Sequence, residues 1–402
     1  MAAPNKTSRF GPGFLVTAAF IGPGTVTTCS MAGAQFGYSL LYAVILATII
    51  TFFLQEMTGR LALASGSDLG QALRDFPQKK ITRLSFIILT LSSITFGCAA
   101  YEAGNIIGGS LGLEMVFFLP QKFWVVFISL IAALILSRRR YQLVEKFLIF
   151  LVFLMSASFL ATLIIIRPNL FQVVKGLIPS FPKNSVYITL ALIGTTVVPY
   201  NLFLHSAAVK AKWSSKSDLK RVKVDLALSI GLGGLISASI IVTAAVTFFQ
   251  AGLPLEKGAQ LAFQLKPLFG PLATFLFGLG FFAAGLSSAL TAPYAAAFAS
   301  SGVLGWEKGQ YSKGFRGVWL GVILAGLVVS LFNFNPLAVI VLAQVANGLI
   351  LPVASVFLLI ILNNRQRMGN LINSLKRNII GSIIIAIVSF LGIWNVAKIF
   401  LK

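Results

Sequence analysis

The sequence predicts an all-α integral membrane protein with about eleven transmembrane helices. Of its 402 residues, 57% are hydrophobic and only 10% are charged, with a mean hydropathy of +0.91. A soluble chain would carry about a quarter charged residues. The apolar runs also reach the roughly 20 residues that a helix needs to cross a bilayer. These two observations exclude a soluble globular protein.

The predicted spans follow one another with short loops between them. They lie near residues 12–35, 39–65, 84–112, 122–137, 144–166, 187–208, 224–250, 268–300, 315–333, 336–362 and 376–400. Because no long polar segment separates them, we expect residues 1–402 to form a single transmembrane domain.

The net charge of +22 at first suggests a nucleic-acid partner. However, the Lys and Arg residues lie almost wholly between the apolar runs, and most of them fall on the same side of the membrane as the amino terminus. By the positive-inside rule, this asymmetry predicts a multi-pass protein of the plasma (inner) membrane with a cytoplasmic amino terminus. We therefore expect the charge to contact membrane lipid and not nucleic acid.

Two spans are interrupted by helix breakers. The first carries Gly22-Pro23-Gly24 in mid-run, and the sixth carries Pro199 in mid-run. One such break could be a simple proline kink. Two breaks, five helices apart, are typical of a 5+5 inverted repeat with a midplane site between the broken helices. We expect the repeats at about 12–166 and 187–362, followed by an extra helix at about 376–400.

The residues around both breaks carry a resemblance. The stretch GPGFLVTAAFIGPGT in the first span, PYNLFLHS in the sixth and GLSSALTAPYAAAF in the eighth resemble segments of the NRAMP (natural resistance-associated macrophage protein) family of metal transporters. In that family the first broken helix carries Asp-Pro-Gly-Asn and the sixth carries Met-Pro-His-Asn, followed by a stretch ending Leu-His-Ser. The resemblance covers nearly the whole chain and implies a LeuT-like fold and a transport function.

The chain departs from the family pattern at the positions that bind metal. Gly22 stands where the family has its metal-binding Asp, and Thr25 where it has Asn. Val198 replaces a Met, Thr195 replaces an Ala, and Tyr200 replaces a His that the family links to proton transfer. Divalent cations usually need at least one negatively charged ligand or soft nitrogen and sulfur ligands. These departures argue against the family's usual transition-metal cargo, and we predict no protein metal ligands.

The remaining groups at the breaks are neutral hydrogen-bond donors and acceptors. The second half of the first helix begins near Thr25, and a helix amino terminus is a ready anion site. The hydroxyls could instead satisfy carbonyls within their own helices. The predicted substrate-binding residues are Ala19, Gly22, Gly24, Thr25, Thr195, Val198, Tyr200, Gln344 and Asn347.

Ion coupling has two sets of candidates. LeuT-like transporters hold sodium between the first-helix break and hydroxyls of the eighth helix, which here implicates Gly22, Ser287, Ser288 and Thr291. Helix packing is the alternative role for these hydroxyls. Glu102 is the better placed of two intramembrane acids, and the family links acids in this part of the third helix to proton transfer. Glu56 is expected to pair with Arg60, one turn later.

The leading hypothesis is a secondary active transporter that imports a small inorganic anion, with bicarbonate as the best guess and sodium as the coupling ion. The alternative is a divalent metal cation transporter, for Mg²⁺ or Mn²⁺, with altered selectivity. A non-transporting sensor would be expected to carry appended soluble domains. We expect no enzymatic activity, no cofactor other than a bound Na⁺, and no obligate protein partner.

Overall fold

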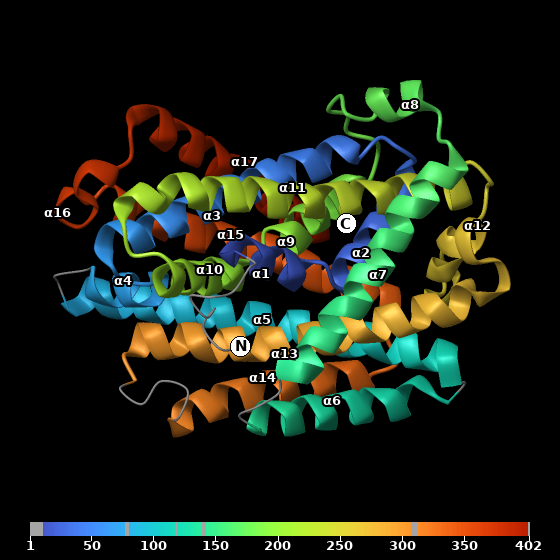
Figure 1. Ribbon diagram of the computed structural model, residues 1–402, viewed down its shortest axis with the longest axis horizontal. Helices are drawn as coiled ribbons and strands as arrows, with labels where there is room; N and C mark the ends of the chain where they lie inside the picture. Colours follow the sequence, from blue (N-terminus) through green and yellow to red (C-terminus); the bar gives the residue numbers. More distant parts are fainter. Residues whose placement is uncertain (1–10, 77–79, 118, 139–141, 307–311, 401–402) are drawn as a thin grey trace.

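The computed structural model describes residues 11–76, 80–117, 119–138, 142–306 and 312–400, and this part of the chain is helical (Figure 1). Nine helices in it are long and apolar enough to cross a membrane. A tenth span is formed by α1 (Pro12–Phe20) and α2 (Pro23–Phe36), which meet at a bend of 59°. The shorter apolar helix α6 (Gln121–Ser137) lies at the fourth predicted span. The predicted all-α membrane fold is confirmed.

The helices follow the order that the apolar runs predict. The remaining long elements are α3 (Leu41–Ser65), α5 (Lys80–Phe117), α7 (Gln142–Ile166), α9 (Val186–Thr196) with α10 (Pro199–Lys212), α11 (Leu219–Ala244), α13 (Ala273–Leu304), α14 (Lys313–Leu331), α15 (Pro336–Leu362) and α17 (Leu375–Phe400). Short helices lie between them: α4 (Leu69–Asp75), α8 (Leu170–Lys175), α12 (Lys266–Phe269) and α16 (Arg365–Met368). The repeat boundaries and the cytoplasmic side of the amino terminus stay predictions, and residues 1–10 lie outside the described residues.

Both predicted helix breaks are present, and each ends at a proline. α1 ends at Phe20 and α2 begins at Pro23, while α9 ends at Thr196 and α10 begins at Pro199. Proline suits the first position of a helix because the amide it lacks would have no partner there. The short segments between the half-helices therefore leave the helical conformation, as the sequence predicts for spans one and six.

The centre of the molecule is held together by glycines that let helices approach closely. A Cβ atom built at Gly285 of α13 would lie 2.4 Å from the Cα of Gly109 on α5, and one at Gly112 would lie 2.4 Å from the backbone nitrogen of Phe282. Small residues of this kind are the usual contact residues between membrane helices. α5 and α13 thus form a tightly packed support against which the broken helices lie.

Candidate functional site

The two helix breaks meet at a pair of threonines. The hydroxyl of Thr25, in the first turn of α2, lies 2.8 Å from the hydroxyl of Thr195, in the last turn of α9. The Thr25 hydroxyl also donates to the carbonyl of Phe20, the last residue of α1. Both threonines are fully buried. Thr25 therefore ties the two halves of the first span together and links them to the sixth, while its role in binding substrate stays a prediction.

The eighth span contributes a hydroxyl at the first break. A Cβ built at Gly22 would lie 2.7 Å from Ser288 Oγ on α13, so this serine lies beside the position that carries an aspartate in the NRAMP pattern. By contrast, the Thr291 hydroxyl donates to the carbonyl of Ser287, 2.9 Å away within the same helix. Of the three predicted α13 hydroxyls, the structure thus brings Ser288 directly to Gly22.

Of the two predicted amides on α15, Gln344 lies at the first break, whereas Asn347 lies beside Gly97 of α5. A Cβ built at Gly24 would lie 2.3 Å from Gln344 Nε2, so the missing side chain of Gly24 makes room for this amide. Gln344 Nε2 donates to the carbonyl of Ile340, but its Oε1 is buried and has no hydrogen-bond partner among the described residues. Asn347, on the same helix, has a buried Nδ2 that likewise lacks one. A buried polar atom without a partner is costly, so Gln344 Oε1 is a candidate ligand for a water molecule or a solute at the first break.

Two buried tyrosine rings lie beside the sixth-helix break. Tyr200 follows Pro199 in α10, and its ring meets that of Tyr101 on α5 edge-on, with ring centroids 5.9 Å apart. Both rings are buried, and neither phenol hydroxyl has a hydrogen-bond partner among the described residues. Val198 and Ala19 are buried as well and add only apolar surface.

Glu102 follows Tyr101 in the sequence, but its side chain is directed toward α14. A Cβ built at Gly326 of α14 would lie 2.6 Å from Glu102 Cγ, so the glutamate packs against α14. Asn105 Nδ2 donates to Glu102 Oε2 across 3.4 Å, and Oε1 has no hydrogen-bond partner among the described residues. The structure therefore does not bring Glu102 into the group around Gly22 and Thr25, although a coupling role remains a prediction.

The described residues contain no group of three or more His, Cys, Asp and Glu side chains that could hold a metal ion. Glu56 pairs with Arg60 at 3.4 Å, as its position one turn away predicts. His205 lies 3.0 Å from the Thr58 hydroxyl through its Nδ1, a contact between α10 and α3. The oxygen atoms that the structure places at the first break, those of Thr25, Ser288 and Gln344, are neutral.

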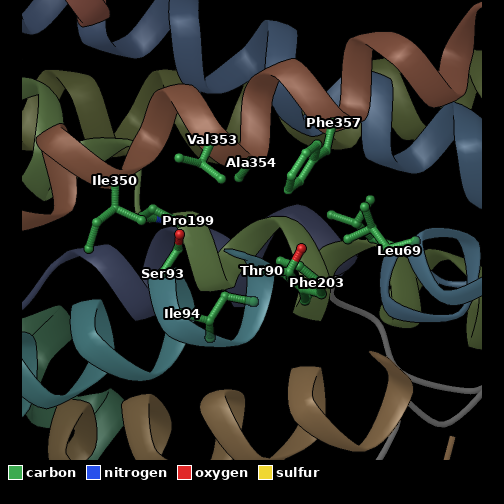
Figure 2. Close-up of a pocket in the computed structure, with 11 residues that line it drawn as sticks. Leu69, Thr90, Ser93, Ile94, Pro199, Phe203, Ile350, Val353, Ala354 and Phe357 are labelled. Atoms are coloured by element: carbon green, nitrogen blue, oxygen red, sulfur yellow. The ribbon is translucent and has the colours of Figure 1, made fainter. Parts of the chain in front are cut away.

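A cavity beside the sixth-helix break was not predicted from the sequence. It lies next to Pro199 and Phe203 of α10 and is lined by side chains of α4, α5 and α15, among them Leu69, Ser93 and Phe357 (Figure 2). Apolar side chains dominate the lining, so the cavity offers few ligands to an ion. The sequence gives no signal for it because its residues come from four separate helices.

The fold and the two broken helices place this chain in the LeuT-like class of membrane proteins. The structure is similar to those of MhsT in complex with L-phenylalanine (TM-score 0.60, 16% identity, 96% of this chain and 99% of that chain) and of inward-facing Mhp1 (TM-score 0.57, 13% identity, 96% and 91%). It is also similar to that of the Eremococcus coleocola manganese transporter (TM-score 0.80, 23% identity, 96% and 86%).

The comparison of sequences also shows the family to which this chain belongs. The profile of the family described as natural resistance-associated macrophage protein-like matches residues 13–398, so this chain belongs to the NRAMP family. The divalent metal cation transporter MntH of Nostoc sp. is 30% identical over 399 residues, which cover 96% of this chain and 89% of that protein. MntH of Bacillus subtilis is 28% identical over 401 residues, with coverage of 97% and 92%.

These relatives favour one of the two predicted cargoes over the other. Their names specify divalent metal cations, so they support the metal alternative better than the bicarbonate hypothesis. The same names describe transporters, while the expectation of no enzymatic activity stays a prediction. The missing carboxylate at Gly22 favours an anion, whereas similarity over the whole chain favours the cargo class named for these relatives.

Proposed function

We propose that this NRAMP-family chain is a secondary active transporter of a divalent metal cation with altered selectivity. One observation carries the proposal: the chain matches proteins named divalent metal cation transporters over almost its entire length. The preserved breaks at Pro23 and Pro199 support it, because broken helices provide the midplane ion sites of such folds. We further propose that it lies in the plasma membrane with its amino terminus in the cytoplasm, following the positive-inside rule.

The chemistry of the site favours Mg²⁺ over Mn²⁺ as the cargo. Mg²⁺ prefers oxygen ligands and keeps several of its waters when bound to proteins. The hydroxyls of Thr25 and Ser288 and the Oε1 of Gln344 are neutral oxygens near the first break. Softer transition metals gain from sulfur and nitrogen ligands, and the family's Met is Val198 here. A hydrated ion held by neutral oxygens therefore fits these residues.

A second candidate cargo is a small anion such as bicarbonate, coupled to Na⁺. It is favoured by the residues that meet at the breaks, since Gly22, Thr25, Thr195 and Ser288 carry no negative charge. The amino terminus of α2 begins at this break, and a helix amino terminus attracts negative charge. In this case Ser288 beside Gly22 would serve the coupling Na⁺.

Uptake into proteoliposomes distinguishes the two cargoes. The purified chain is reconstituted, and uptake of Mg²⁺, Mn²⁺ and labelled bicarbonate is measured with and without Na⁺ and proton gradients. We expect saturable uptake of a divalent cation, with Mg²⁺ preferred over Mn²⁺. Saturable bicarbonate uptake without uptake of either metal would overturn the metal proposal and establish the second candidate.

A further inference from the structure

One buried carboxylate on α3 lies within 4 Å of three cationic side chains. Glu56 Oε2 is 3.4 Å from Arg60 Nε, and Glu56 Oε1 is 3.8 Å from Lys223 Nζ and 3.9 Å from Arg377 Nη2. The Glu56 side chain is only 7% exposed. A single negative charge therefore faces three positive charges contributed by α3, α11 and α17.

The three cations are not equivalent. Arg60 is fully buried and donates to the carbonyl of Leu371 at 3.1 Å and to Asn373 Oδ1 at 2.7 Å. Its hydrogen bonds thus fix it within the protein. Lys223 and Arg377 lie farther from Glu56 than a hydrogen bond reaches, and their side chains are 43% and 32% exposed. Their N–H donors are available to a ligand outside the protein.

Lys223 and Arg377 also lie where helices begin. Lys223 is in the second turn of α11, which starts at Leu219, and Arg377 is in the first turn of α17, which starts at Leu375. A helix amino terminus carries a partial positive charge, which is unfavourable for a cation beside it. The two helix ends and the two cations therefore produce one region of positive potential. The ends of transmembrane helices lie at the level of the lipid headgroups.

An apolar stripe on α3, exposed at Ile45 and Ile49 and half-buried at Phe52, leads to this cationic site. Ile45, Ile49, Phe52 and Glu56 follow one another at intervals of three or four residues, which places them on one face of the helix. Ile45 and Ile49 are 45% and 57% exposed. α17 lies against the same helix, since a Cβ built at its Gly381 would be 3.7 Å from the ring of Phe53.

α11 borders α3 as well. A Cβ built at Gly234 of α11 would lie 2.4 Å from Thr48 Oγ1, and Leu228 of α11 exposes 64% of its surface. On α17, Ile379 and Ile383 expose 50% and 52%. The surfaces next to the cationic site are therefore apolar, as those that contact lipid acyl chains are.

We propose that Lys223 and Arg377 bind the phosphate headgroup of an anionic phospholipid whose acyl chain lies along the Ile45–Ile49–Phe52 stripe of α3. An ammonium and a guanidinium both form charge-assisted hydrogen bonds to phosphate oxygens. Glu56 balances the charge of the buried Arg60, so the lipid meets two uncompensated cations. The adjoining apolar stripe selects a phospholipid over a free phosphate ion. The site is independent of the transported cargo.

The test uses the full chain purified in detergent, and it measures thermal unfolding during titration with phosphatidylglycerol. The variant Lys223→Gln/Arg377→Gln is compared with Lys313→Gln/Arg316→Gln, which removes the same charges from the exposed first turn of α14. A basic residue near an anionic membrane surface adds about fivefold in affinity. The double variant should therefore need about 25-fold more phosphatidylglycerol for half of the thermal shift, while the control should match the wild type.

Other probes identify the ligand. Phosphatidylcholine, which is zwitterionic, and glycerol phosphate, which lacks acyl chains, should each give no saturable shift. If the double variant folds poorly, Lys223→Gln alone should weaken binding about fivefold. An equal response to phosphatidylglycerol in wild type and variants would overturn the proposal, and a saturable shift with glycerol phosphate alone would overturn the assignment to lipid.

Discussion

Replacing Gly22 with aspartate would return a carboxylate to the first-helix break, and the effect depends on the sign of the cargo's charge. The new Cβ would lie 2.7 Å from Ser288 Oγ, which is too close. We therefore pair the substitution with Ser288→Ala and compare Gly22→Asp/Ser288→Ala with Gly22→Asn/Ser288→Ala. The two double variants have nearly the same shape, so their difference reports the charge.

For a divalent cation the carboxylate is attractive. At about 4 Å and an effective dielectric constant of about 20, the attraction is roughly 8 kcal/mol before desolvation. Burying the carboxylate costs several kcal/mol. We expect a net gain of about 1.4–2.8 kcal/mol, which is a ten- to hundredfold lower KM for Mg²⁺ or Mn²⁺ in the aspartate variant than in the asparagine variant.

For a singly charged anion the same carboxylate is repulsive by roughly 4 kcal/mol, which corresponds to about a thousandfold weaker binding. The assay is initial uptake into proteoliposomes over a range of cargo concentrations. A selective loss of bicarbonate uptake in the aspartate variant, with no gain for metals, would refute the metal reasoning. Equal KM values in the two variants would show that the cargo does not bind near Gly22.

Three further substitutions test contacts at this site and elsewhere in the fold. Thr25→Val removes the hydrogen bonds to the carbonyl of α1 and to α9, so we expect an unfolding free energy lower by about 1–3 kcal/mol and a raised KM in the uptake assay. Gly285→Ala places a Cβ 2.4 Å from backbone on α5 and should destabilise by about 1–3 kcal/mol in thermal unfolding. The control Gly321→Ala, with nothing within 4 Å, should be neutral or stabilising; equal losses would contradict the packing argument. Glu56→Gln leaves the buried Arg60 without its carboxylate and should lower the unfolding free energy by about 3–5 kcal/mol. A loss below about 1 kcal/mol would show that the pair contributes no more than a solvent-exposed salt bridge does.

The departures from the family pattern have one physical consequence under either cargo. With Gly22 and Val198 in place of the family's Asp and Met, these two positions at the helix breaks supply neither a charged nor a sulfur ligand. Discrimination between ions must then come from hydroxyls, amides and retained water. Such a site would distinguish ions by size and hydration more than by softness.

Much of the fold was predictable because its signals are local. Long apolar runs specify transmembrane helices, since an unsatisfied backbone group is costly in hydrocarbon. Pro23 and Pro199 specify where two of these helices break, because each removes a backbone donor from the helix. The NRAMP family was also recognisable from motifs around these prolines, and the family profile confirmed it.

The sequence by itself thus determined the spans, the two breaks and the polar residues available at them. Only the tertiary structure decided which of those residues meet: Thr25 joins Thr195 and Ser288 reaches Gly22, whereas Glu102 turns toward α14. It alone also brought Lys223 and Arg377 to Glu56. The reason is physical, because apolar periodicity and proline chemistry act within one helix. The partner of a side chain depends instead on how helices far apart in the chain pack and rotate against each other.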